Sequence, residues 1–245
     1  MGTKDQHDNG TIIKRKVLMN IRKYISLTFL FTFLIFLTSC KDSINDSQAG
    51  DNVTVSLAMD KGLNKIGSDP IVLDTVKILL KDIKFRQSNG DSSNVKVGPM
   101  VAHLNLNGIP TEFAAGKILA GNYDKIKFRL HKPEAGDIIS DPEFIAGSSG
   151  ELRYSVIVKG TYNGVPFIYK STKTATQEVN LKNYVNLNAE VKTNVTLSVD
   201  VNFWFYKDAV VLDPNNIINQ NDIDNNIKDS FKKAFRDANK DGIAD

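Results

Sequence analysis

The last nine residues of the chain carry the spacing best suited to binding a metal ion. The pattern D-x-N-x-D-G-x-x-D starts at Asp237 and ends at the last residue. Calcium takes six to eight oxygen ligands, and alternate residues on a tight loop can present three side-chain oxygens. The sequence therefore predicts a Ca²⁺ site in the Asp-rich tail, residues 237–245. Its ligands would be the side chains of Asp237, Asn239, Asp241 and Asp245 and the backbone carbonyl of Ile243.

This pattern resembles the start of an EF-hand loop and, more closely, the aspartate-rich calcium repeats of thrombospondin type. It departs from both, because the chain ends before the bidentate glutamate of an EF-hand and holds a single copy. The alternative interpretation is a polar C-terminal tail without a metal. Calcium is the cofactor that this pattern suggests.

Four aromatic side chains could form a surface that binds a ligand. Trp204 and Tyr206 alternate with the apolar residues of the run 195–205, and Tyr162 and Tyr169 flank a predicted hairpin. Exposed aromatic rings stack on sugars or on partner proteins. In the alternative interpretation, a C-terminal helix covers the face that holds Trp204, which then belongs to the core.

The motifs of common hydrolases are absent from the sequence. It contains no Gly-x-Ser-x-Gly and no glycine-rich phosphate loop. His103 and His131 lack metal-binding spacing and are interpreted as ordinary strand histidines. The alternative interpretation is a two-histidine haem site that resembles those of some secreted haem-binding lipoproteins. The carboxylates are scattered, so a pair for glycoside hydrolysis is an open alternative. We therefore expect a protein that is not an enzyme.

Cys40, the only cysteine, ends a segment with the features of a secretory signal. Arg22 and Lys23 precede the apolar stretch 25–37, and basic residues before an apolar core of about 7–15 residues are typical of such signals. Leu-Thr-Ser-Cys at 37–40 resembles the lipobox of bacterial lipoproteins. The resemblance implies a diacylglycerol on the Cys40 sulfur, cleavage before Cys40, and a protein held on a membrane.

The chain accordingly divides into a removed segment and a mature part. Residues 1–39 are predicted to be a signal peptide with an over-extended start, the true start lying near Met19, and residues 40–52 a lipidated cysteine with a flexible tether. Without residues 1–39 the chain has 25 basic and 26 acidic residues. This near balance of charges does not favour the binding of nucleic acid.

Period-two alternation of apolar residues predicts a mostly β fold, an antiparallel β-sandwich over residues 53–213. The longest alternating run, 195–205, predicts one long strand. Asn163-Gly164 predicts a hairpin turn, and a change of parity near Lys81-Asp82 predicts a bulge within the strand 71–85. After the sandwich, apolar residues at helical spacing predict an amphipathic C-terminal helix over 214–236, packed on the sandwich. These residues are Ile223, Ile227, Phe231, Ala234 and Phe235.

Two stretches, 74–85 and 119–128, resemble a family of bacterial lipoproteins that carry a domain of unknown function. They read DTVKILLKDIKF and LAGNYDKIKF. The resemblance implies a β-sandwich, a location in the cell envelope and no established activity. Lys41-Asp42 after the cysteine resembles the export tags of Bacteroidetes surface lipoproteins, which implies an outer-membrane location.

Together these features predict a lipid-anchored β-sandwich of the cell envelope with a non-enzymatic binding or surface-structural role. The expected partners are the membrane, through the anchor, and a surface polysaccharide or an envelope protein. The first alternative is a calcium-dependent or carbohydrate-binding surface module, and the second is an envelope hydrolase.

Overall fold

The computed structural model describes residues 50–60, 70–146 and 152–245. The predicted signal peptide (1–39), the predicted lipidation site Cys40 and most of the predicted tether lie outside these residues. Within the described ranges, no helix is long and apolar enough to cross a membrane.

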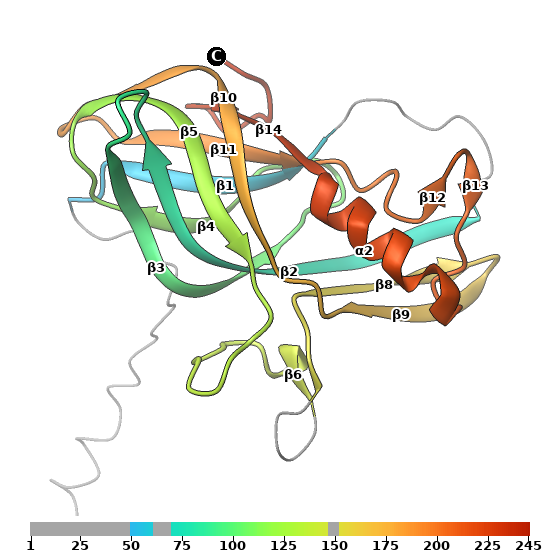
Figure 1. Cartoon of the computed structure of the whole chain (residues 1–245). Coiled ribbons are helices and arrows are strands. Elements are labelled where there is room, and N and C mark those ends of the chain that lie inside the picture. The colour runs from blue at the N-terminus through green and yellow to red at the C-terminus, as the bar shows by residue number, and fades with distance from the viewer. Residues whose placement is uncertain (1–49, 61–69, 147–151) are drawn as a thin grey trace, which may run out of the picture. The chain divides into compact units, whose positions relative to one another are not determined.

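Ten strands form one curled sheet (Figure 1). Their order is β4-β1-β11-β14-β10-β5-β2-β8-β9, and β3 pairs with β2 off this path. The strands of this sheet are β1 (Val53–Met59), β2 (Ile71–Arg86), β3 (Ser92–His103), β4 (Thr111–Gly116), β5 (Gly121–Leu130), β8 (Val156–Tyr162), β9 (Val165–Ser171), β10 (Ala175–Leu187), β11 (Thr193–Val199) and β14 (Phe231–Arg236).

Short elements complete the described chain. They are the strand pairs β6 (Ile145–Ala146) with β7 (Leu152–Arg153) and β12 (Tyr206–Lys207) with β13 (Val210–Val211), the 3₁₀ turns η2 (Pro142–Phe144) and η3 (Ile217–Asn219), and the helix α2 (Gln220–Asp229). The prediction of a mostly β, sandwich-like fold with one C-terminal helix is confirmed. The sheet is mixed instead of fully antiparallel, because β1 pairs with β11, and β10 with β14, in parallel.

The sheet curls around one apolar core until β3 lies close to β4. Alternate residues of each strand point inward, as Val55 of β1 and Leu197 of β11 do, and both are fully buried. At the meeting of β3 and β4, a Cβ atom on Gly116 would lie 2.1 Å from the carbonyl oxygen of Val95. Only glycine therefore permits this approach of the two strands.

The local turn predictions are confirmed. Strands β8 and β9 form a hairpin through Asn163 and Gly164, whose φ angles of 50° and 79° are both positive, as a type I′ turn requires. Strand β2 has a register shift between Lys81 and Ile83, and Asp82 has a φ angle of 58°. This is the bulge predicted from the change of parity.

The C-terminal helix is shorter than predicted. Helix α2 buries Ile223 and Ile227, as the helical spacing indicates, but it ends at Asp229, so the prediction that it reaches residue 236 is wrong. Residues 231–236 form β14, and a register shift against β11 leaves Lys232 and Lys233 both exposed. Because of this bulge, the buried residues Phe231, Ala234 and Phe235 are spaced as they would be on one face of a helix, although they lie in a strand.

Because β14 lies inside the sheet, the β domain does not end at residue 213. It continues to the C-terminal tail, and the predicted division between the sandwich and a helix packed on it is wrong for residues 231–236.

The apolar run 195–205 is not one long strand, and this prediction is also wrong. Strand β11 ends at Val199, and the Asp200 carboxylate then accepts a hydrogen bond from the amide of Asn202 at 3.0 Å. The amide of Trp204 donates to the carbonyl of Val201 at 3.3 Å. These bonds turn the chain and break the alternation, so that Phe203 is exposed and Trp204 is buried.

The contact of β3 with β4 gives a test of the curled sheet. We expect Gly116→Ala to lower the free energy of unfolding by about 1–3 kcal/mol, since the new methyl group must displace the backbone at Val95. Gly121→Ala is the control, because its Cβ would meet only the flexible side chain of Gln87. Urea unfolding measures both variants. A Gly116→Ala protein as stable as Gly121→Ala would contradict the close approach.

Candidate binding sites

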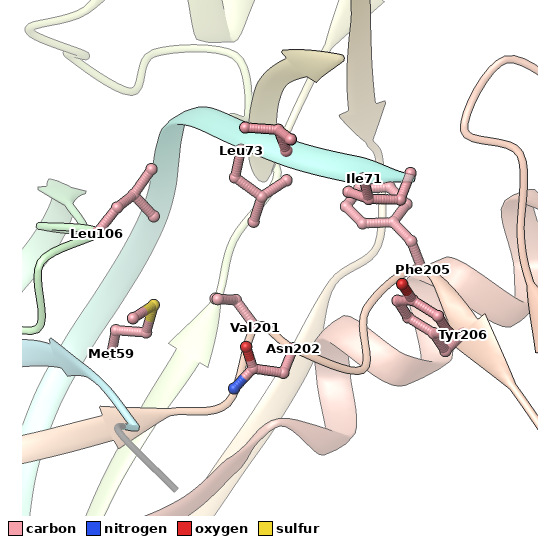
Figure 2. Close-up of a pocket in the computed structure, with 9 residues that line it drawn as sticks. Met59, Ile71, Leu73, Leu106, Val201, Asn202, Phe205 and Tyr206 are labelled. Carbon is pink, nitrogen blue, oxygen red and sulfur yellow. The ribbon is translucent and has the colours of Figure 1, made fainter. Parts of the chain in front are cut away.

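An apolar pocket of about 280 Å³ opens at one end of the curled sheet (Figure 2). It lies between the end of β1, the start of β2 and the turn that follows β11. Met59, Leu73 and Leu106 come from three separate segments of the chain and surround the space (Figure 2). The remaining lining residues are Ile71, Val72, Val201, Asn202, Phe205 and Tyr206.

The lining limits what this pocket can do chemically. Its polar side-chain groups are the amide of Asn202 and the hydroxyl of Tyr206, and all other lining side chains are hydrocarbon or thioether. Ligand pockets are commonly apolar with a few polar groups that fix orientation. General acid–base catalysis most often uses a His, Glu, Asp or Lys near the reacting atoms, and none of these is among the described residues of the lining. The lining is thus of the kind that holds an apolar ligand.

Among these lining residues, only Tyr206 was predicted from the sequence to contact a ligand. Met59, Leu73 and Leu106 read as ordinary residues of strands and loops, and nothing in their own neighbourhoods marks them. The pocket arises because segments far apart in the sequence meet, and sequence spacing does not report such a meeting.

Asp237, the first predicted calcium ligand, is fully buried within the protein. Its Oδ2 accepts hydrogen bonds from the Thr196 hydroxyl at 2.6 Å and from the Gly242 amide at 3.1 Å. Its Oδ1 accepts from the Asp241 amide at 3.0 Å. Asn194 also donates to the backbone carbonyl of Asp237, at 3.0 Å. These contacts fix the tail on the outer face of β11.

The other predicted calcium ligands stabilise the tail in similar ways. Asn239 and Asp241 are exposed and hydrogen-bond to each other at 3.0 Å, and Asp241 accepts from the amide of Ile243 at 2.7 Å. Asp245 accepts from the amide of Ala238 at 2.9 Å. Across residues 50–60, 70–146 and 152–245, no group of three or more His, Cys, Asp or Glu side chains could hold a metal. Calcium binding stays a prediction from the sequence pattern.

Two of the four predicted aromatic ligand contacts lie under α2. Trp204 is 0% exposed, and Asn226 of α2 donates to its carbonyl at 3.1 Å. The Tyr169 hydroxyl donates to Asp224 of α2 at 2.7 Å, and burial with this bond raises the pKa of Tyr169. Neither ring is open to solvent as a sugar-stacking surface requires. This matches the alternative interpretation of Trp204.

The other two aromatic candidates are half-buried and lie in different places. Tyr162 ends β8 at the hairpin, whereas Tyr206 lines the apolar pocket (Figure 2). The structure therefore does not gather the four rings into one surface.

An ion-pair cluster on β2 and β8 was not predicted from the sequence. Lys77 lies 2.6 Å from both Asp141 and Glu143, and Lys159 lies 2.6 Å from Glu143. Hydrogen bonds from Lys159 and Lys77 lower the pKa of Glu143 to about 2. The contacts join the segment around η2 to the outer face of these strands.

The buried His131 belongs to a neighbouring set of contacts. Its Nε2 lies 2.6 Å from Asp137, which also accepts from Lys81 at 3.0 Å and from the amide of Glu134 at 2.7 Å. Burial alone would raise the pKa of the Asp137 carboxyl, but these hydrogen bonds hold it well below its usual range. Because His131 is 0% exposed, we interpret the His131–Asp137 contact as structural. It holds the loop that follows β5 against the sheet.

Comparison with known proteins adds little to this geometry. No family model matches the chain, and no curated protein matches it. Among solved structures, MbnP from Methylosinus trichosporium is similar with a TM-score of 0.36 and 11% sequence identity, over 60% of this chain and 74% of that one. A similarity this low carries no argument about this protein.

The burial of Asp237 gives a test of the tail. We expect Asp237→Ala to lower the free energy of unfolding by about 2–3 kcal/mol, since the Thr196 hydroxyl and two amides lose their acceptor. Asp241→Ala is the control. Its carboxylate is exposed, so the expected loss in urea unfolding is below about 1 kcal/mol. Equal small losses would show that the tail is not fixed by Asp237.

The same two variants test the calcium prediction. A calcium site would need both carboxylates, so any heat that the unsubstituted protein gives in calorimetric titration with calcium should vanish in both variants. If the unsubstituted protein gives no heat, the tail has a structural role alone.

Proposed function

We propose that the protein is a lipid-anchored, non-enzymatic binding protein of the bacterial cell envelope. It holds a small apolar ligand in the pocket at the end of its sheet. The observation that carries this proposal is the lining of the pocket, which is apolar apart from one amide and one hydroxyl. The lipobox-like segment that ends at Cys40 supports the location.

The position of the pocket suits a protein tethered at its N-terminal side. The tether leads into β1 at Val53, and Met59 at the other end of the same strand lines the pocket. A strand of this length spans about 20 Å at roughly 3.3 Å per residue. The pocket therefore lies at the end of β1 opposite to Val53, the end that the predicted tether precedes in the sequence.

The alternatives receive less support from the site. A carbohydrate-binding surface would need exposed aromatic rings, and Trp204 and Tyr169 are buried under α2. An envelope hydrolase would need a nucleophile or a pair of carboxylates in the pocket, and the lining offers an amide and a phenol.

The pocket is tested by filling it. The chain from residue 40 onward, with Cys40→Ser so that no lipid competes, is titrated with N-phenylnaphthylamine, a neutral apolar probe whose fluorescence rises on burial. We expect Leu106→Trp to weaken binding about tenfold or more, because the larger ring occupies the pocket. Leu152→Trp, an exposed site on β7, is the control and should bind as the unsubstituted protein does.

Two results would overturn the apolar site. One is a folded protein that does not bind the probe, and the other is a Leu106→Trp variant with unchanged affinity. A thermal melt of each variant shows whether it is folded.

The anchor is tested separately. A bacterium that expresses the full chain and grows with labelled palmitate should label the protein, and Cys40→Ser should remove the label, because the cysteine sulfur and the amino group freed by cleavage carry the acyl chains. Equal label in both proteins would remove the lipid anchor from the proposal.

A further inference from the structure

A second and larger hollow lies on the opposite, outer face of the same end of the sheet. It has a volume of about 690 Å³. Ala58 of β1, Ser198 of β11 and Lys233 of β14 are register neighbours, so their side chains lie side by side on this face. Ala58 and Ser198 are small and buried, and together with Phe235 they give the hollow a largely apolar floor.

The C-terminal tail forms one wall of this groove. Ile243 and Ala244 line it, and the Ile243 side chain is 65% exposed although it is aliphatic. The hydrogen bonds from the tail amides to Asp237 fix this wall in place. An exposed aliphatic residue on a fixed wall offers a contact for an apolar ligand.

Lysine side chains surround the groove. Lys182 of β10 and Lys232 and Lys233 of β14 line it, against one acidic residue, Asp60. Asp60 lies 2.6 Å from Lys233. Within the part of the chain that the structure describes, the side chains of Lys182 and Lys232 form no hydrogen bond or ion pair. The groove is therefore locally positive on a mature chain whose basic and acidic residues nearly balance.

We propose that this groove binds an amphipathic anion, a free aliphatic chain that ends in a carboxylate. The chain would lie on the floor against Phe235 and Ile243, and the carboxylate would reach Lys182 and Lys232. Among the described residues of the lining, the uncharged polar side chains are Asn180 and Ser198, too few to satisfy the hydroxyl groups of a sugar. The site is distinct from the apolar pocket, so the inference goes beyond the proposed function.

The groove is tested with dodecanoate, by calorimetric titration of the chain from residue 40 with Cys40→Ser. We expect binding, and a loss of about tenfold or more in affinity for Lys182→Glu/Lys232→Glu, because both cations that meet the carboxylate are reversed. Ile243→Asp should also weaken binding, since it places a like charge on the apolar wall. Lys117→Glu/Lys132→Glu is the matched control, as both lysines are exposed and neither lines the groove.

Further measurements distinguish binding in the groove from binding in the apolar pocket and from apolar contact alone. Binding that survives Leu106→Trp but is lost in Lys182→Glu/Lys232→Glu belongs to the groove and not to the apolar pocket. Dodecanol, which has the same chain without the charge, should bind at least about tenfold more weakly. Raising the salt concentration should weaken dodecanoate binding and leave dodecanol unchanged.

Four outcomes overturn the proposal. The first is a folded protein that does not bind dodecanoate, and the second is dodecanol binding as tightly as dodecanoate. The third is a control variant that loses as much affinity as the groove variant. The fourth is binding to phosphatidylglycerol vesicles without binding to free dodecanoate, which would make the groove a contact for a lipid surface.

Discussion

Strand β14 is the constraint on which the rest of the fold depends. It pairs antiparallel with β11 and parallel with β10, and so joins β4-β1-β11 to β10-β5-β2-β8-β9 in one sheet. Without it these two groups would each expose an open edge, and strands with open edges tend to pair with other chains. The joining strand comes from residues 231–236, near the end of the chain. The sheet is therefore completed by non-local pairing, which forms slowly compared with local contacts.

The residue that follows β14 extends this constraint to the tail. A buried carboxylate is costly unless hydrogen bonds satisfy it, and Asp237 accepts three, from Thr196, Asp241 and Gly242. Two of the donors are tail amides, so satisfying Asp237 folds the tail back on the sheet. The alternating side chains that suggest a calcium loop thus act in the structure as acceptors for the tail's own backbone. The same bonds place Ile243 at the wall of the groove.

Local patterns predicted the elements whose structure is decided locally. The alternation in 53–59, the hairpin at Asn163-Gly164 and the bulge at Asp82 each depend on a few neighbouring residues. The apolar spacing at 231–236 led to the wrong prediction of a helix, because a bulge in a strand reproduces helical spacing. Only the pairing of these residues with β11 distinguishes the strand from a helix. The parallel strand pairs and the apolar pocket could not be predicted from the sequence for a related reason. Both depend on which distant segments meet, and no short window of sequence contains that information.

The two hollows meet at the end of β1. Met59 at the end of β1 lines both the apolar pocket and the groove, while its neighbour Ala58 points to the outer face as alternation requires. Methionine is unbranched and adapts its shape to its surroundings. Met59 can therefore adapt to a ligand in the inner pocket, while the small side chain of Ala58 forms part of the groove floor on the outer face. The end of β1 farthest from Val53 thus separates an apolar pocket on the inner face from a groove with lysines around it on the outer face.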